Sequence, residues 1–317
     1  MRYTISIALA SLLSLPAAAE VPRVITDIPP VGALVAQVMG DLGSPQVLLD
    51  KGANAHAFQL RPSQAADLAA AGLVVWVGPD MTPWLDRTLD GLSSAPHLQL
   101  LTTPGTMLLD YADSGHDADD HADHAAEADH AKADAHDHDH KGHDHKGHDP
   151  HAWLDPANAR VWLAAIATEL STLDPDNAST YAANAATAQA AITTLDAELA
   201  ATLAPAKGQP IVLFHDAYGY FAAHYGLTIA GTIAMGDAAS PGAQHLRDLQ
   251  SGMTDTPICI FPEANHDPKL VAVMAEGTTA RIGQPLDPEG STLTPGAGLY
   301  GDMMRKLAST IAACITG

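Results

Sequence analysis

The amino-acid sequence predicts an α/β fold of two βα domains with parallel-type sheets, joined by one long rigid helix. Short apolar runs alternate with helical patterns in the first and the last third of the chain, and this alternation is typical of parallel sheets. Residues 156–206 contain no glycine and many alanines, which predicts helices. A run of histidine and aspartate, residues 113–149, interrupts the pattern ahead of these helices.

The first βα domain is predicted over residues 20–155. Residues 73–78 form a continuous apolar run bounded by glycine, as expected for a strand covered on both faces. Pro62 lies in the first turn of a predicted helix and Gly72 at its end, the positions that these residue types favour. The expected strands are 23–30, 45–50, 73–78 and 97–101, and the expected helices are 31–41, 61–72 and 81–92.

Two helices are predicted within residues 156–206. The first spans 156–173. Asp174 is suited to an N-cap and Pro175 to a first helical position, so a second helix is expected over 175–203. At 1.5 Å per residue this helix would be about 40 Å long. Such a length fits a rigid connector between two α/β halves.

The second βα domain, residues 207–317, repeats the alternation. The same apolar and glycine-bounded patterns define its elements. The expected strands are 210–216, 227–232, 256–263 and 279–286, and the expected helices are 217–226, 241–253, 267–277 and 298–315.

The run over residues 113–149 is expected to be a disordered loop, because it contains no Val, Leu, Ile, Phe, Trp or Tyr with which to bury surface. Short His-rich tracts are typical of metal binding, and neutral imidazole is a common zinc ligand. The run therefore predicts accessory zinc binding, with collection, sensing, gating or simple solvation as possible roles. It holds ten of the seventeen histidines: His116, His121, His124, His130, His136, His138, His140, His143, His145 and His148.

Residues 1–19 match a cleavable signal peptide, with Arg2 first, an apolar run next and Ala17 to Ala19 before the cleavage point. We therefore expect export to the periplasm, with no lipid anchor, because no cysteine follows the apolar run. The net charge of -22 argues against nucleic acid and anionic membrane surfaces as partners and favours cations. In an exported chain the two cysteines, Cys259 and Cys314, predict one disulfide, the alternative being two free buried thiols.

Three histidines outside the run are candidate zinc ligands: His56, His151 and His215. Each lies in or beside a loop and is followed by a helical segment, and parallel sheets place sites beyond their carboxyl ends. Three neutral imidazoles suit zinc, which takes four ligands, mostly nitrogen or sulfur. Any one histidine could instead be structural, and that is how we interpret the remaining four: His97, His224, His245 and His266.

At these residues the sequence resembles the periplasmic zinc-binding proteins of bacterial ABC zinc importers, the ZnuA family, over nearly the whole mature chain. The resemblance implies the fold of metal-binding periplasmic binding proteins. It also implies a zinc site at His56, His151 and His215 between two domains, and a disulfide between Cys259 and Cys314. The matching segments are HAFQLRPS, VVWVGPDM, DPHAWLDP, FHDAYGYF and SPGAQHLRDL, together with the acidic His-rich loop.

The sequence leaves the identity of the fourth zinc ligand open. Some zinc relatives carry a glutamate just before the first histidine, but this chain has Ala55 there. Asp287 aligns with a ligand aspartate of other metal-binding relatives, so we predict Asp287 as the fourth ligand, with water as the alternative. Manganese-binding relatives usually carry a carboxylate where His215 stands, so His215 favours zinc.

The expected function is high-affinity capture of Zn²⁺, as a transported ligand, and its delivery to an ABC zinc permease and its ATPase in the inner membrane. Other periplasmic zinc chaperones are further expected partners, and the protein is expected to be a monomer and not an enzyme. One alternative is a zinc buffer or chaperone that acts mainly through the His-rich loop. The other is a zinc hydrolase, which is disfavoured because the sequence has no H-E-x-x-H motif.

Overall fold

The computed structural model describes residues 20–110, 147–234, 241–254 and 257–317. The predicted signal peptide lies outside the described residues. So does most of the His-rich run, including its histidines His116, His121, His124, His130, His136, His138, His140, His143 and His145. None of the described helices is long and apolar enough to cross a membrane.

The first half of the chain folds into a four-stranded parallel sheet in the order β2-β1-β3-β4. The all-parallel order confirms the βα pattern that the sequence predicts. The central strand β3 is buried along its whole length, as its unbroken apolar run requires. The elements are β1 (Val24–Thr26), α1 (Pro29–Met39), β2 (Gln46–Val47), α2 (Pro62–Ala69), β3 (Leu73–Trp76), α3 (Pro83–Leu92) and β4 (His97–Gln99).

The second half forms another four-stranded parallel sheet, in the order β6-β5-β7-β8. In this order β5 and β7 are neighbours although β6 lies between them in the sequence. The elements are β5 (Pro210–His215), α6 (Gly219–Tyr225), β6 (Thr228–Ala234), α7 (Ala243–Gly252), β7 (Cys259–Ile260), α8 (Lys269–Ala275), β8 (Arg281–Ile282) and α9 (Leu299–Thr316).

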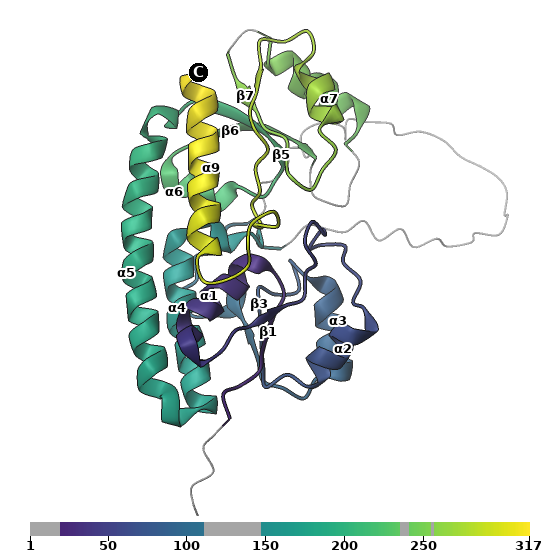
Figure 1. The fold of residues 1–317 in the computed structure, drawn as a ribbon. Helices are drawn as coiled ribbons and strands as arrows, with labels where there is room; N and C mark the ends of the chain where they lie inside the picture. The colour runs from purple at the N-terminus through teal and green to yellow at the C-terminus, as the bar shows by residue number, and fades with distance from the viewer. Residues whose placement is uncertain (1–19, 111–146, 235–240, 255–256) are drawn as a thin grey trace, which may run out of the picture.

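Two long helices, α4 (Pro156–Leu173) and α5 (Ala178–Leu203), connect the two sheets. The predicted start of the second helix at Pro175 is three residues early, because Pro175–Asn177 form a 3₁₀ turn. The helix α5 runs alongside α4, α1 and α9 (Figure 1). Its buried side chains recur every three or four residues, as expected for one packed face: Tyr181, Ala185, Ala188, Ile192, Leu195, Leu199 and Leu203.

The packing of α5 makes the two halves share one hydrophobic core. A single cluster of buried side chains includes Val75 of the first sheet, Ile192 of α5, Leu213 of the second sheet and Met304 of α9. The long helix is therefore part of the core rather than a free-standing connector. The predicted disulfide is confirmed: Cys259 on β7 bonds to Cys314 on α9, which fixes the last helix to the second sheet.

Candidate metal centre

The three histidines singled out in the sequence lie close together. His56 lies in the loop between β2 and α2, His151 lies just before a 3₁₀ turn at Ala152–Leu154, and His215 is the last residue of β5. The ring centroids of His56 and His151 are 5.5 Å apart, and those of His151 and His215 are 5.4 Å apart. Residues separated by up to 159 positions thus form one cluster of imidazoles.

His151 is oriented by the aspartate two residues before it. Its Nδ1 lies 2.6 Å from Oδ1 of Asp149, and its backbone N–H donates to the same oxygen at 2.9 Å. A carboxylate that accepts the Nδ1 proton fixes the tautomer with its lone pair on Nε2. The Nε2 of His151 is buried and has no hydrogen-bond partner among the described residues. Its lone pair is thus available for a cation.

His215 has the same kind of partner, but from a distant part of the chain. Its Nδ1 lies 2.7 Å from Oε1 of Glu263, and the hydroxyl of Tyr218 donates to that oxygen at 2.9 Å. Both side chains are almost fully buried. Glu263 therefore orients the His215 ring through its Nδ1.

His56 is positioned through the backbone of its loop. The side chain of Asn54 accepts hydrogen bonds from the backbone N–H groups of His56 and Ala57, at 2.8 and 3.1 Å. The indole of Trp84 donates to the carbonyl of Ala55 at 2.6 Å, which anchors the loop to α3. The buried methyl of Ala55 packs in the core, and it offers no ligand atom.

Asp287, predicted as a fourth ligand, is buried near the histidines and accepts four hydrogen bonds. Its Oδ1 accepts from the backbone N–H and the hydroxyl of Ser291, at 2.9 and 3.1 Å. Its Oδ2 accepts from the backbone N–H and the hydroxyl of Thr292, at 2.8 and 2.6 Å. A carboxylate has about four acceptor sites, so these contacts favour a structural role for Asp287 in the turn that follows it.

The structure adds acidic and imidazole groups that sequence patterns did not single out. Glu263, His266 and Glu289 line a small cavity beside His215. The ligand-type atoms of His215, Glu263 and His266 all lie within 4.8 Å of one another. The ring of His266 also stacks on Phe214, with centroids 4.2 Å apart. His266 thus lies closer to the cluster than its sequence context suggested.

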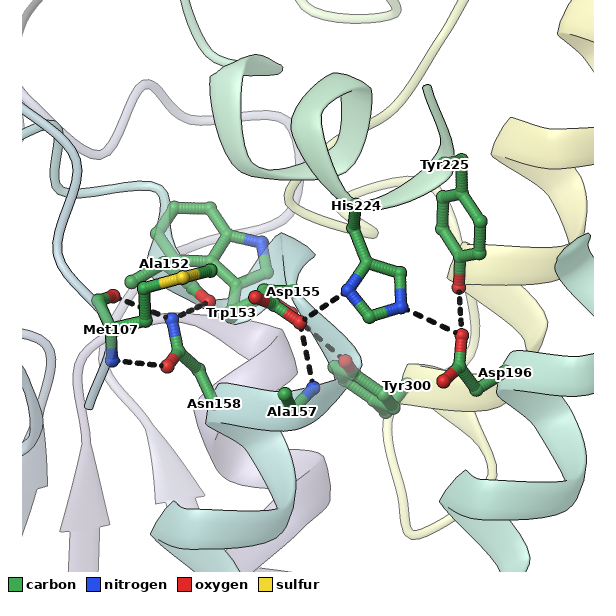
Figure 2. A network of polar contacts seen from close by, with 10 residues as sticks. All are labelled: Met107, Ala152, Trp153, Asp155, Ala157, Asn158, Asp196, His224, Tyr225 and Tyr300. Atoms are coloured by element: carbon green, nitrogen blue, oxygen red, sulfur yellow. Dashed lines mark hydrogen bonds and ion pairs between the residues drawn. The ribbon is translucent and has the colours of Figure 1, made fainter. Parts of the chain in front are cut away.

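A partly buried ion-pair network supports the segment that carries His151 (Figure 2). His224 on α6 lies between two carboxylates: its Nδ1 is 3.0 Å from Oδ1 of Asp155, and its Nε2 is 2.9 Å from Oδ1 of Asp196. These carboxylates, Asp155 above all, raise the pKa of His224 to about 9. The side chain of Asp155 also caps α4 by accepting from the backbone N–H of Ala157. The charged imidazolium therefore joins α6, which follows His215, to α4 and α5.

The end of the His-rich run is more ordered than the sequence predicts. Of its ten histidines only His148 lies in the described residues, where its Nδ1 is 2.8 Å from Oδ1 of Asp110. His148 and Asp110 also form an antiparallel bridge. Asp149 is buried, and its N–H donates to the carbonyl of Leu109 at 2.8 Å. The predicted end of the disordered loop at Asp149 is therefore wrong, because His148 and Asp149 already make backbone contacts with Asp110 and Leu109.

The fold and this cluster define a class of protein: two α/β halves that share one core, with a candidate metal centre built from imidazoles of both halves. The model of the family described as zinc-uptake complex component A, periplasmic (ZnuA), matches residues 24–314. The chain belongs to this family, and the resemblance inferred from its motifs is confirmed.

Similar proteins share almost the full length of the chain. The high-affinity zinc uptake system protein ZnuA of Paracoccus denitrificans is 51% identical and covers 98% of each chain. The protein of that name from Brucella suis is 33% identical over 94% of this chain and 93% of its own. A crystal structure of ZnuA superimposes with a TM-score of 0.71 at 24% identity, over 92% of this chain and 98% of that one. This last similarity confirms the predicted fold.

Proposed function

We propose that this protein captures Zn²⁺ in the periplasm and delivers it to the membrane permease of an ABC-type zinc importer. Membership in the family of periplasmic zinc-uptake components supports this function. Its relatives from Paracoccus denitrificans and Brucella suis are high-affinity zinc uptake proteins by name. The function is transport, so zinc is cargo and no reaction is performed on it. The importer's ATPase and periplasmic zinc chaperones would be further partners of a monomeric carrier.

The observation that carries the proposal is the cluster of His56, His151 and His215. The rings of adjacent members are 5.4–5.5 Å apart, and two of the three have an Nδ1 next to a buried carboxylate. Neutral imidazoles held in one tautomer by carboxylates are the arrangement that proteins use to bind zinc. We therefore propose these three side chains as ligands. Asp287 remains a prediction, and its four hydrogen bonds to Ser291 and Thr292 weigh against it.

The test is zinc binding by the purified protein and by three variants, His56→Ala, His151→Ala and His215→Ala. Competition with a chelator of known affinity measures the tight site. Each variant is expected to weaken binding by about 100-fold or more, because loss of a ligand leaves an incomplete set. His97→Ala, which removes an exposed histidine at the start of β4, is the control. Wild-type affinity in all three ligand variants would contradict the proposed site.

A further inference from the structure

Two buried tyrosines flank a glycine at the start of α6. Tyr218 is the N-cap residue of this helix, and Gly219 and Tyr220 are its first two residues. The helix follows β5, whose last residue is His215. The two tyrosines are only 2% and 0% exposed, and buried hydroxyls of this kind are hydrogen-bonded inside the protein. The partners of these hydroxyls show what the segment positions.

Tyr218 holds the acceptor of the His215 imidazole. Its hydroxyl donates to Oε1 of Glu263 at 2.9 Å, and the same oxygen lies 2.7 Å from Nδ1 of His215. The ring of Tyr218 also lies edge-on to that of His215, with centroids 6.2 Å apart. One carboxylate oxygen is thus fixed between a phenol and the imidazole that it orients.

Tyr220 fixes the backbone of the residue that orients His151. Its hydroxyl donates to the carbonyl of Asp149 at 2.8 Å and accepts from the backbone N–H of Leu109 at 2.9 Å. The N–H of Asp149 in turn donates to the carbonyl of Leu109 at 2.8 Å. Both backbone polar groups of Asp149 are therefore held, while Oδ1 of its side chain lies 2.6 Å from Nδ1 of His151.

Gly219 leaves room for the other carboxylate oxygen of Asp149. A methyl group at position 219 would lie 3.0 Å from Oδ2 of Asp149 and 3.8 Å from the side chain of Leu109. The shorter of these distances is well inside the optimal separation of non-bonded atoms, about 3.5–4.0 Å for two carbons. A side chain at this position would therefore displace Asp149 from its place beside His151.

From these contacts we propose that the segment 218–220 is a positioning element that sets the orientation of two zinc ligands, His151 and His215. The inference rests on the proposed function. The two hydroxyls act through Asp149 and Glu263, whose carboxylates hold the imidazoles, and not as ligands. Partners of this kind fix the ring orientation and raise the basicity of a metal-bound histidine. Because one short segment serves both carboxylates, the geometry of the two imidazoles depends on the start of α6.

The test compares Tyr218→Phe and Tyr220→Phe with Tyr181→Phe, and each change removes one buried hydroxyl while it keeps the ring. Tyr181 donates to Asp174 at 2.8 Å, at the other end of α4 from His151. It therefore controls for the loss of a buried hydrogen bond. Chelator competition is expected to show zinc affinity about tenfold weaker in the two test variants and unchanged in Tyr181→Phe.

Gly219→Ala tests the same segment without removing a hydrogen-bonding side chain. The added methyl is expected to weaken zinc binding by about tenfold, because it displaces Asp149 from its contact with His151. Gly252→Ala, at the last residue of α7, is the control, since a methyl there meets open space among the described residues. Chemical unfolding without metal checks that each variant is folded.

Cobalt(II) in place of zinc reports on ligand geometry, because its visible spectrum depends on how the ligands are arranged. The spectra of Tyr218→Phe and Tyr220→Phe are expected to differ from that of the wild type, and the spectrum of Tyr181→Phe to match it. Weaker binding with an unchanged spectrum would mean that the hydroxyls act on stability alone, and would overturn the inference. Wild-type affinity in all three test variants would also overturn it.

The proposed site itself is tested separately by the three histidine variants. Tight zinc binding that survives in those variants would overturn the site. Loss of binding in them, together with wild-type behaviour of the tyrosine and Gly219 variants, would overturn only the role of the segment 218–220. The two failures are therefore distinguishable.

Discussion

The Nδ1 of His215 lies 2.7 Å from Oε1 of Glu263, and the two side chains are 5% and 4% exposed. They are 48 residues apart in the sequence. They meet because β5 and β7 are neighbours in the second sheet, and His215 ends β5 while Glu263 follows β7 by three residues. The carboxyl ends of parallel strands meet at one edge of a sheet, which brings the acceptor to the imidazole.

Glu263→Gln is expected to weaken zinc binding by about 10–100-fold, because a charged acceptor on Nδ1 orients the ring and raises its basicity as a ligand. The glutamine keeps the size of the side chain and removes its charge. Chelator competition measures the affinity, with Glu276→Gln as the control for loss of a surface carboxylate. Thermal unfolding without metal checks that the variant is folded. Equal affinity in the folded variant and the wild type would exclude this role for Glu263.

His224 is expected to make the stability of the metal-free protein depend on pH. Its folded pKa is raised to about 9 by Asp155 and Asp196, above an unfolded value of about 6.5. A group with a raised folded pKa contributes its full stabilisation below the unfolded pKa and loses it as pH rises through the folded pKa. The free energy of unfolding of the wild type should therefore exceed that of His224→Gln by about 1–2 kcal/mol below about pH 6.5, after allowance for the partial exposure of His224.

The measurement is chemical unfolding of both proteins across about pH 6 to 10. The difference in free energy of unfolding should shrink between about pH 6.5 and pH 9 and then level off. His97→Gln controls for the removal of an exposed imidazole. A difference that stays constant across this pH range would mean that Asp155 and Asp196 do not hold His224 in its charged form.

Deletion of residues 113–146 is expected to leave one tight zinc site and to remove only weaker sites. The three clustered histidines lie outside the deleted segment, and so does Asp149, the partner of His151. The deletion also keeps the bridge between Asp110 and His148. Calorimetric titration of the deleted and full-length proteins gives the number and affinity of sites. Loss of the tight site would favour the alternative in which the His-rich run is the main zinc buffer.

Replacement of Cys259 and Cys314 by serine is expected to lower stability while one tight zinc still binds. The bond spans 55 residues, and a cross-link of this size stabilises a protein by about 2–4 kcal/mol, chiefly by restricting the unfolded chain. Chemical unfolding of the double variant and the oxidised wild type measures this loss. If zinc stoichiometry fell to zero in the folded variant, α9 would have to support the metal centre directly.

Sequence patterns predicted most helices and strands, because the spacing of the apolar residues and the positions of glycine and proline were clear. The apolar run over 73–78 predicted β3, and the glycine-free residues 156–206 predicted α4 and α5. The helix predicted between Pro62 and Gly72 corresponds to α2. The three candidate ligands were found because each stood in a polar loop next to a predicted helix or strand end. The disulfide followed from the cysteine count and the family resemblance, and the structure confirms it.

The sequence by itself determined the order of strands and helices, the family, and the three histidines, because these depend on local periodicity and short motifs. Only the tertiary structure decided the partners of those histidines. Glu263 reaches His215 because β5 and β7 are neighbours in the sheet, and the ion pair between His224 and Asp196 joins α6 to α5. Glu289 lines the same small cavity as His215. Such contacts join residues far apart in the chain, and local patterns carry no signal for them.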